Sequence, residues 1–397
     1  MTKVNVPYPD TQASSQQEES SALTPSQQRK EDHIQLCYQG DVGLSGDPGL
    51  WSEIQLIHNA LPELNLSDLS TETNLFDRFN FSAPIMLTGM TGGTHRAAII
   101  NRGIARLCNE LSIPFGLGSM RILAQSEHNP QLLSTFRVRT VAPKVCLMGN
   151  IGVNQLRDLG VDQVKRMCDQ VDANILAIHL NPAMELIQPG RDADSDFTSG
   201  YKTIEEACET IGRPVIVKEC GCGLSPQVVN RLVNAGVRCV DVSGVGGTSW
   251  VKLEALRAEG MDSDSEQARL GHLLADWGIP TAAAVLLAAP SRAQVIASGG
   301  ITNALEAVKA LSLGADMVGL ARPVLQAFLR GYDSHKEGEL AEEAGYESAR
   351  AFLLELSRGI RVITALTGAR STRQLRDMPK LLGPKLRTWE TLKIGGK

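Results

Sequence analysis

Residues 294–322 read QVIASGGITNALEAVKALSLGADMVGLAR. The apolar run 295–297 predicts a buried strand, and the glycines after Ser298 predict a turn. Residues 304–313 then show a helical pattern that ends before Gly314, and a second apolar run follows at 317–320. A strand, a helix and a strand in this order predict two parallel strands joined by a helix on the sheet face.

The same alternation recurs along the chain from Pro84 onward. Each short apolar or β-branched run is followed by a polar or glycine-rich turn and then by a helical pattern. The eight runs lie at residues 85–87, 114–117, 145–148, 175–178, 215–217, 239–242, 295–297 and 317–320. Eight βα units in about 240 residues match the size of a (β/α)₈ barrel, the TIM-barrel architecture. A doubly wound parallel sheet is the alternative α/β fold.

Both ends of the chain extend beyond this pattern. Residues 1–28 are rich in Ser, Gln, Glu and Pro and poor in apolar residues, which is typical of a disordered leader. After the eighth run, Phe352, Leu356 and Ile360 recur at helical spacing and Gly368 follows, so we expect a C-terminal helix packed on the barrel. We therefore divide the chain into a leader, 1–28, and a single domain, 29–397.

Composition and charge restrict the classes of function. Hydrophobic residues make up 43% of the 397 residues and charged residues 21%, which suits a globular chain with a large core. The net charge is −5, with 39 Lys and Arg against 44 Asp and Glu, so no global basic field favours nucleic acid or an anionic membrane. The longest strongly apolar run, 281–289, is far shorter than the roughly 20 residues that cross a bilayer. We expect no membrane span and no nucleic-acid partner.

The cysteines and the N-terminus point to the compartment. The eight cysteines are scattered without the C-x-x-C pairs of a zinc site, and the N-terminus has no basic flank followed by an apolar run. Such cysteine usage suits a reducing cytosol. We therefore expect a cytoplasmic protein.

Polar and glycine-rich residues follow most of the eight runs, and in a barrel these strand ends form the active-site face. Gly299 and Gly300 follow the seventh run and Ala321 and Arg322 the eighth, which are the positions where barrels hold a phosphate on backbone N–H groups. Lys218 ends the fifth run and is either a buried ion-pair partner or a cation beside an electron-rich ring. The polarity around it favours the second interpretation.

Two more groups of residues are candidates for binding a ligand or a metal. Arg29 and Lys30 are either a solvated charge pair or, if the segment folds over the barrel mouth, a clamp for a second phosphate group. His179, Asn181 and Glu185 extend from the fourth run into its loop and are interpreted as substrate and metal contacts. A carboxylate that faces a diphosphate typically holds Mg²⁺, which keeps much of its water and bridges protein and phosphate oxygens.

Nine motifs occur in order along the chain: RKEDH at 29–33, HNALP at 58–62, MTGGT at 90–94, GSMR at 118–121, HLNP at 179–182, PVIVKE at 214–219, DVSG at 241–244, GGTSW at 246–250 and ASGGI at 297–301. In these motifs, and from about Gln28 to Leu382, the sequence resembles the type 2 isopentenyl-diphosphate isomerases. These are FMN-dependent barrel enzymes of isoprenoid synthesis.

The resemblance implies interconversion of isopentenyl diphosphate and dimethylallyl diphosphate, with reduced FMN as acid and base and NADPH serving only to reduce the flavin. The FMN contacts that it implies are Thr88, Met90, Ser119, Asn150, Lys218, Ser243, Thr248, Gly299, Gly300, Ala321 and Arg322. The prenyl diphosphate contacts that it implies are Arg29, Lys30, Arg121, His179, Asn181 and Trp250. It also implies Mg²⁺ on Glu185 and a homo-oligomer.

The sequence departs from the family on the substrate side. The family motif reads His-Leu-Asn-x-x-Gln-Glu, and its Gln is a candidate proton relay, but this chain has Met184 there. A thioether has no proton to donate, so it cannot replace the amide. The following loop, 188–192, also differs and has extra residues before Phe197. Thr302 stands where the family commonly has Arg. Met120 replaces a usual Gln without evident consequence.

Several functions remain compatible with these departures. In the first, the flavin alone carries both proton transfers and the protein is an isomerase. In the second, the apolar, adaptable Met184 lines a pocket for a longer or cyclising prenyl substrate. The isomerase ranks first because the diphosphate and metal residues remain. An FMN-dependent hydroxy-acid oxidase ranks low, because the loop 243–250 supplies neither a His base nor an Arg clamp. A flavin-binding protein without catalysis is a further alternative.

Overall fold

Eight parallel strands close into a barrel in the computed structural model, which describes residues 23–124, 129–188, 195–262 and 265–392. The barrel strands are β4 (Ile85–Leu87), β5 (Phe115–Gly116), β6 (Leu147–Gly152), β7 (Ile175–Leu180), β8 (Val215–Glu219), β9 (Cys239–Asp241), β10 (Gln294–Ser298) and β11 (Met317–Leu320). They follow one another in chain order, and β11 pairs with β4 to close the ring. The predicted (β/α)₈ barrel is confirmed, and the doubly wound sheet is wrong.

The third strand is displaced from its expected place. We expected it at residues 145–148, but β6 spans Leu147–Gly152 and includes Asn150. At residues 145–147, side chains bond to backbone groups that a strand would pair with its neighbours. Arg139 donates to the carbonyl of Val145, and Asn174 accepts from the N–H of Leu147. Pairing with β7 then continues to Gly152, which lies opposite His179.

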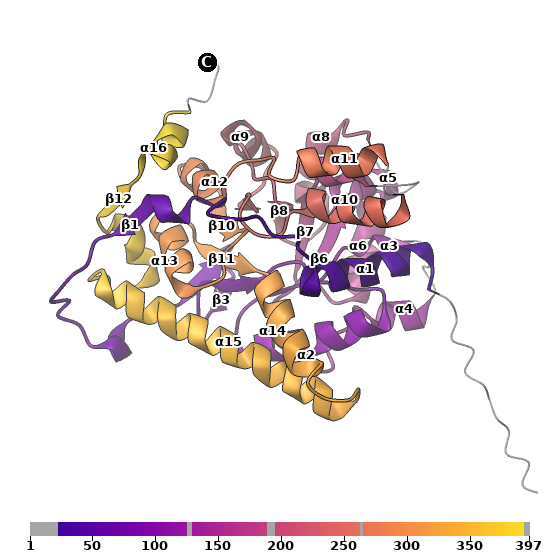
Figure 1. The fold of residues 1–397 in the computed structure, drawn as a ribbon, viewed down its shortest axis with the longest axis horizontal. Coiled ribbons are helices and arrows are strands. Elements are labelled where there is room, and N and C mark those ends of the chain that lie inside the picture. Colours follow the sequence, from indigo (N-terminus) through magenta and orange to yellow (C-terminus); the bar gives the residue numbers. More distant parts are fainter. Residues whose placement is uncertain (1–22, 125–128, 189–194, 263–264, 393–397) are drawn as a thin grey trace, which may run out of the picture.

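Helices surround the barrel on its outside (Figure 1). They are α2 (His95–Leu111), α3 (Arg121–Ala124), α4 (Pro130–Ser134), α5 (Val153–Leu159), α6 (Val161–Gln170), α7 (Pro182–Ile187), α8 (Gly200–Thr210), α9 (Pro226–Asn234), α10 (Trp250–Met261), α11 (Glu266–Leu273), α12 (Thr281–Ala288), α13 (Ala304–Ser312) and α14 (Arg322–Tyr332). The expected C-terminal helix is α15 (Glu339–Leu366), which packs against α2, α13 and α14. A last helix, α16 (Pro384–Glu390), packs near α12.

A hairpin closes the N-terminal end of the barrel. Strands β2 (Thr73–Leu75) and β3 (Phe79–Phe81) pair antiparallel, and the side chain of Gln294 holds their turn through the N–H of Phe76 and the carbonyl of Asn74. The apolar hairpin residues pack against inward-facing side chains of seven barrel strands: Met86, Met148, Ile175, Ile216, Cys239, Ile296 and Met317. Because this end is filled, a ligand enters from the other end.

Helix α1 (Pro25–Gln39) lies over that other end, the C-terminal mouth of the barrel. Thr24 begins the helix with a capping box, in which its hydroxyl accepts from the N–H of Gln27 and the Gln27 side chain accepts from the N–H of Thr24. Residues 25–28 are therefore helical, and the boundary that we placed at residue 28 falls inside α1. Residues 1–22 of the expected leader lie outside the described residues.

The two ends of the domain are tied together. Strand β1 (Ile54–Leu56) pairs antiparallel with β12 (Lys380–Leu382), so the segment after α1 and the segment after α15 form one small sheet.

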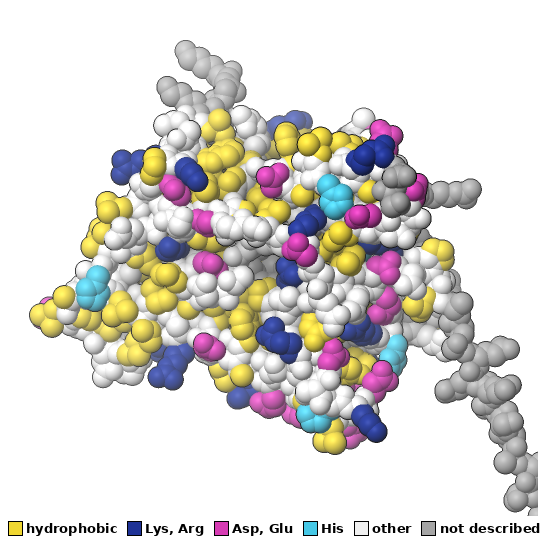
Figure 2. Space-filling model, in the orientation of Figure 1, with side chains coloured by type: hydrophobic (Ala, Val, Ile, Leu, Met, Phe, Trp, Pro, Cys, Tyr) yellow, Lys and Arg dark blue, Asp and Glu magenta, His cyan; other side chains and the backbone are white. Residues whose placement is uncertain are grey.

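On the face seen in Figure 2, basic and acidic side chains are interspersed among apolar ones. Within the described ranges, no helix combines the length and apolarity needed to cross a membrane.

Candidate active site

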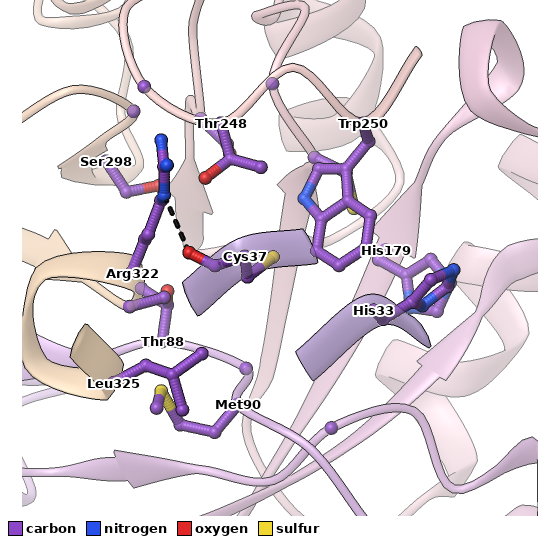
Figure 3. A pocket seen from close by; sticks show the side chains of 18 of the residues that line it. His33, Cys37, Thr88, Met90, His179, Thr248, Trp250, Ser298, Arg322 and Leu325 are labelled. Atoms are coloured by element: carbon purple, nitrogen blue, oxygen red, sulfur yellow. Dashed lines mark hydrogen bonds between the residues drawn. The ribbon is translucent and has the colours of Figure 1, made fainter. Parts of the chain in front are cut away.

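A cavity of about 450 Å³ lies at the C-terminal mouth of the barrel. The seven loops that follow β4, β5, β7, β8, β9, β10 and β11 contribute to its wall, and α1 lies across it. Figure 3 shows side chains from α1 and α14 beside the strand-end residues of the same cavity. A single site of this kind is what the strand-end residues of a (β/α)₈ barrel form.

The cavity brings together every residue that the sequence assigned to a ligand. The residues expected around FMN all line it: Thr88, Met90, Ser119, Asn150, Lys218, Ser243, Thr248, Gly299, Gly300, Ala321 and Arg322. So do the residues expected around substrate and metal: Arg29, Lys30, Arg121, His179, Asn181, Trp250 and Glu185. Residues 189–192 of the loop that departs from the family lie outside the described residues.

One end of the cavity is built from bare backbone. Gly299 and Gly300 have φ values of 103° and 80°, which favour glycine, and a Cβ on Gly300 would lie 2.3 Å from backbone atoms of Gly246. Thr281 fixes this turn by donating its hydroxyl hydrogen to the carbonyl of Gly299, with 2.6 Å between the oxygens. The N-terminus of α14 begins at the same place, so N–H groups and the helix dipole are available to an anion.

Arg322, the first residue of α14, connects this end to α1. Its Nε donates to the carbonyl of Cys37 at 2.9 Å, the bond drawn in Figure 3, and its Nη2 donates to the carbonyl of Gly40 at 3.0 Å. The neighbouring Gln326 donates to the carbonyl of Tyr38. Arg322 therefore anchors the end of α1 as well as lining the cavity.

Two buried carboxyl groups, those of Asp241 and Glu219, act on the charge of Lys218. Its Nζ donates to the carbonyl of Glu219 at 2.5 Å and to the sulfur of Cys220 at 3.6 Å. Burial opposes its charge, but Cys220, Asp241 and Glu219 together outweigh burial and raise the pKa of Lys218. Of the two interpretations of this residue, ion-pair partner and cation at the site, its place in the cavity wall favours the second, because no salt bridge joins Lys218 to a carboxylate of the described residues.

The acids beside Lys218 are themselves held by hydrogen bonds. Glu219 accepts the backbone N–H groups of residues 220, 221 and 222, and burial raises its pKa to about 7 against these bonds. Asp241 accepts from the hydroxyl of Ser298 at 2.6 Å, and burial raises its pKa although Lys218 opposes that shift. The charge of Lys218 thus favours the ionised form of both carboxyl groups.

Three cations gather at the opposite end of the cavity. Burial, with Arg29 and Arg121 close by, lowers the pKa of Lys30 to about 7. The Nζ of Lys30 donates to the carbonyl of Ser119 at 3.4 Å. Cations held this close to one another favour the binding of a multiply charged anion.

His179 is neutral in this site. Burial, and then the charges of Lys218, Lys30 and Arg121, lower its pKa to about 3. Asn150 donates its Nδ2 to the carbonyl of Leu117 at 3.0 Å, so its Oδ1 accepts from the Nδ1–H of His179 at 2.9 Å. The Nε2 of His179 therefore carries a lone pair.

Helix α7 adds a carboxylate to the wall. Glu185 is 5% exposed, and its Oε1 accepts from the Nδ2 of Asn181 at 2.9 Å. Met184 lies between them in sequence, is half-buried, and places its sulfur 3.6 Å from the same Asn181 nitrogen. The described residues contain no group of three His, Cys, Asp or Glu side chains suited to a metal, so Glu185 is the carboxylate that α7 offers here.

The sequence did not assign a role to His33. Its Nε2 lies 2.8 Å from Glu254, which is fully buried and also accepts from Arg257 at 2.6 Å. The ring of His33 packs edge-on against Trp250, with centroids 5.2 Å apart (Figure 3). These contacts join α1 to α10, and no local pattern predicts a pair separated by 221 residues.

The chain is similar to several known proteins. Residues 187–376 match the family of FMN-dependent dehydrogenases. The isopentenyl-diphosphate delta-isomerase of Ignicoccus hospitalis is 39% identical over 365 residues, which cover 91% of this chain and 95% of that protein. The enzyme of the same name from Nostoc sp. is 38% identical and covers 78% of this chain and 86% of that protein.

Among solved structures, a mandelate oxidase variant with the monooxide FMN adduct has a TM-score of 0.57 and 15% identity, and the match covers 88% of this chain and 100% of that one. At such identity this similarity concerns the fold alone. The curated relatives are far closer, and they match nearly the full length of both chains. The chain therefore belongs to the type 2, FMN-dependent isopentenyl-diphosphate delta-isomerase family.

Proposed function

We propose that this protein interconverts isopentenyl diphosphate and dimethylallyl diphosphate on a bound, reduced FMN. The observation that carries the proposal is a single cavity with a glycine-lined anion site at one end and three clustered cations beside a buried carboxylate at the other. Its two charged ends suit two phosphate-bearing molecules. Reduced FMN would supply the group that adds and removes protons at the alkene, and NADPH would reduce it beforehand.

The residues at the glycine-lined end fit FMN. The N–H groups around Gly299, Gly300 and Ala321 would hold its phosphate at the start of α14. Lys218, kept cationic by its acidic neighbours, would lie beside the ring system, where a cation stabilises negative charge. The remaining contacts would come from Thr88, Met90, Ser119, Asn150, Ser243, Thr248 and Arg322.

The residues at the cationic end fit a diphosphate. Arg29, Lys30 and Arg121 would bind its oxygens, with His179 and Asn181 completing the contacts and Trp250 beside the prenyl group. Because α1 carries Arg29 and Lys30 and also covers the mouth, its position would exclude water from the reacting carbons. No side chain at position 184 moves a proton, since Met184 has none to give.

We propose that Glu185 binds Mg²⁺. The described part of the chain offers one carboxylate at this place, so diphosphate oxygens and water would supply the other ligands, as Mg²⁺ prefers. Glu185→Gln keeps the shape of the side chain and removes its charge. We expect the Mg²⁺ concentration for half-maximal activity to rise by about 10–100-fold, the range measured when groups around a metal are lost.

The flavin absorption spectrum of Glu185→Gln should be unchanged, because Glu185 is not among the residues proposed to hold FMN. Glu266→Gln, an exposed carboxylate on α11, serves as the matched control. An unchanged Mg²⁺ requirement in Glu185→Gln would contradict the metal assignment.

Diphosphate affinity should depend on pH through Lys30. Its pKa of about 7 means that it is charged below that pH and neutral above it, so affinity for inorganic diphosphate should fall as pH rises from 6 to 8.5. Lys30→Arg keeps the charge at all these values and should weaken the pH dependence. Titration calorimetry of both proteins in two buffers would show more proton uptake on binding in the unsubstituted protein than in Lys30→Arg, because the protons exchanged by diphosphate itself contribute to both; equal uptake in both would contradict the prediction.

A second function is a related isomerase or cyclase acting on a longer prenyl substrate. The feature that bears on it is a small recess beside Met184, lined among others by Leu44, Cys220, Trp250 and Trp277. The recess has a volume of about 10 Å³, which holds about one water molecule, so it offers no space for another isoprene unit in this conformation. The C5 substrate therefore ranks first.

The direct test incubates purified protein with FMN, NADPH, Mg²⁺ and labelled isopentenyl diphosphate. Dimethylallyl diphosphate as product supports the proposal. Turnover of longer prenyl diphosphates without C5 turnover supports the second function, and a protein that binds no FMN overturns both. We further propose that the protein is a cytoplasmic homo-oligomer, which the cysteine usage and the family support; gel filtration with light scattering tests the oligomer.

A further inference from the structure

The side chain of Gln188 is buried at the active site without a complete set of hydrogen bonds. It follows α7, is 3% exposed and lines the cavity. Among the described residues its Nε2 has no hydrogen-bond acceptor. A buried N–H₂ group left unpaired destabilises a protein, so an acceptor from a ligand would explain it.

Gln188 lies beside the same short helix as two residues of the site. Asn181 precedes α7, Glu185 lies within it and Gln188 follows it, and all three side chains are buried and line the cavity. Leu186, by contrast, is 56% exposed. Since Asn181 already donates its Nδ2 to Glu185, Gln188 provides a further amide donor in this part of the wall.

The charges of the cavity restrict what can accept this bond. Arg29, Lys30 and Arg121 carry donors only, so none of them can accept from Gln188. The hydrocarbon part of an isoprenoid has no acceptor either. The remaining acceptors of a prenyl diphosphate are its phosphate oxygens.

We propose that Gln188 is a further substrate-binding residue, whose Nε2 donates a hydrogen bond to the diphosphate group. The inference rests on the proposed function, because it takes the ligand at this end of the cavity to be a diphosphate. Donors from two separate elements, the cations of α1 and the amide after α7, would then contact that group. A diphosphate bound between both elements is held in one orientation.

Such a bond is present in the bound substrate and throughout the reaction, so its loss should raise KM and leave kcat nearly unchanged. Gln188→Leu removes the donor and keeps the volume. We expect the dissociation constant for inorganic diphosphate, measured on the FMN-loaded protein with Mg²⁺, to rise by about tenfold or more, as for other hydrogen bonds to charged groups. Gln188→Glu places a negative charge at the same atom and should weaken binding further.

Gln227→Leu is the matched control, since Gln227 is exposed on α9 and does not line the cavity. It should leave diphosphate affinity and the melting temperature unchanged. If Gln188→Leu changes the melting temperature but binds diphosphate as the unsubstituted protein does, Gln188 has a structural role and the proposal is wrong. An equal affinity of Gln188→Glu for diphosphate overturns it as well.

The same measurements separate this proposal from the proposed function. If the unsubstituted protein binds diphosphate, Gln188→Leu weakens that binding and no dimethylallyl diphosphate forms, the assignment of Gln188 holds and the isomerase activity is wrong. If the unsubstituted, FMN-loaded protein does not bind diphosphate, the assignment of Gln188 is overturned.

Discussion

Replacing Met184 with Gln is expected to raise the rate of dimethylallyl diphosphate formation about a hundredfold or more, because a positioned proton-transfer group contributes about 10²–10⁴-fold. Met184 lies in the cavity wall between Asn181 and Glu185, where its sulfur offers no proton. An amide of similar length fits the same space and can bond to Asn181, whose Nδ2 lies 3.6 Å from the sulfur.

Met184→Leu is the control, since it removes the sulfur and adds no polar group. It should leave kcat and KM for isopentenyl diphosphate near those of the unsubstituted protein, and neither variant should change the flavin spectrum. A gain of the same size in both variants would show that the shape of the wall limits the rate and that proton transfer does not. No gain in Met184→Gln would favour the second function, in which the apolar wall serves a longer prenyl substrate.

The barrel could be predicted because a parallel strand covered on both faces reads as a continuous apolar run. Seven runs coincide with their strands to within two residues at either end. The third, at 145–148, differs because side chains of Arg139 and Asn174 use the hydrogen bonds at the start of that segment. Strand position there depends on side chains outside the run, six and 27 residues from the backbone groups that they bond, which the apolar pattern of the run does not contain.

The elements that the sequence did not predict depend on distant contacts. The hairpin of β2 and β3 has three-residue strands, and it is held by the inward-facing side chains of the barrel. Helix α1 follows a polar leader and is fixed by Arg322 and Gln326, nearly 300 residues later in the chain. Its first turn, residues 25–28, shares the polar composition of the expected leader, so composition alone does not predict where α1 begins.

The candidate site was predictable for a geometric reason. Parallel strands end at one face, so residues after different strands converge whatever their separation in sequence. Contacts made by side chains across that face were not predictable. His33 with Glu254 and the buried amide of Gln188 are recognised only from burial and hydrogen bonding, because isolated His and Gln residues carry no pattern.

The second large effect is expected at Lys218. Replacing Lys218 with Met should destabilise the protein by about 1–3 kcal/mol near pH 8, because it removes a cation that favours the ionised form of the buried Asp241 and Glu219. The affinity for FMN should fall as well, since the same side chain lines the cavity. Lys165→Met, an exposed lysine on α6, is the matched control and should change neither property.

The pH dependence of this loss identifies its cause. Burial already raises the pKa of Asp241 and of Glu219 in the folded protein, and Lys218 opposes both shifts. Without Lys218 both values rise further, so the folded state binds more protons than the unfolded state above pH 4, and its stability falls as pH increases. Thermal unfolding without FMN should therefore show a smaller difference between Lys218→Met and the unsubstituted protein at pH 5 than at pH 8. An equal difference at both values would mean that lost packing, and not unpaired charge, explains the destabilisation.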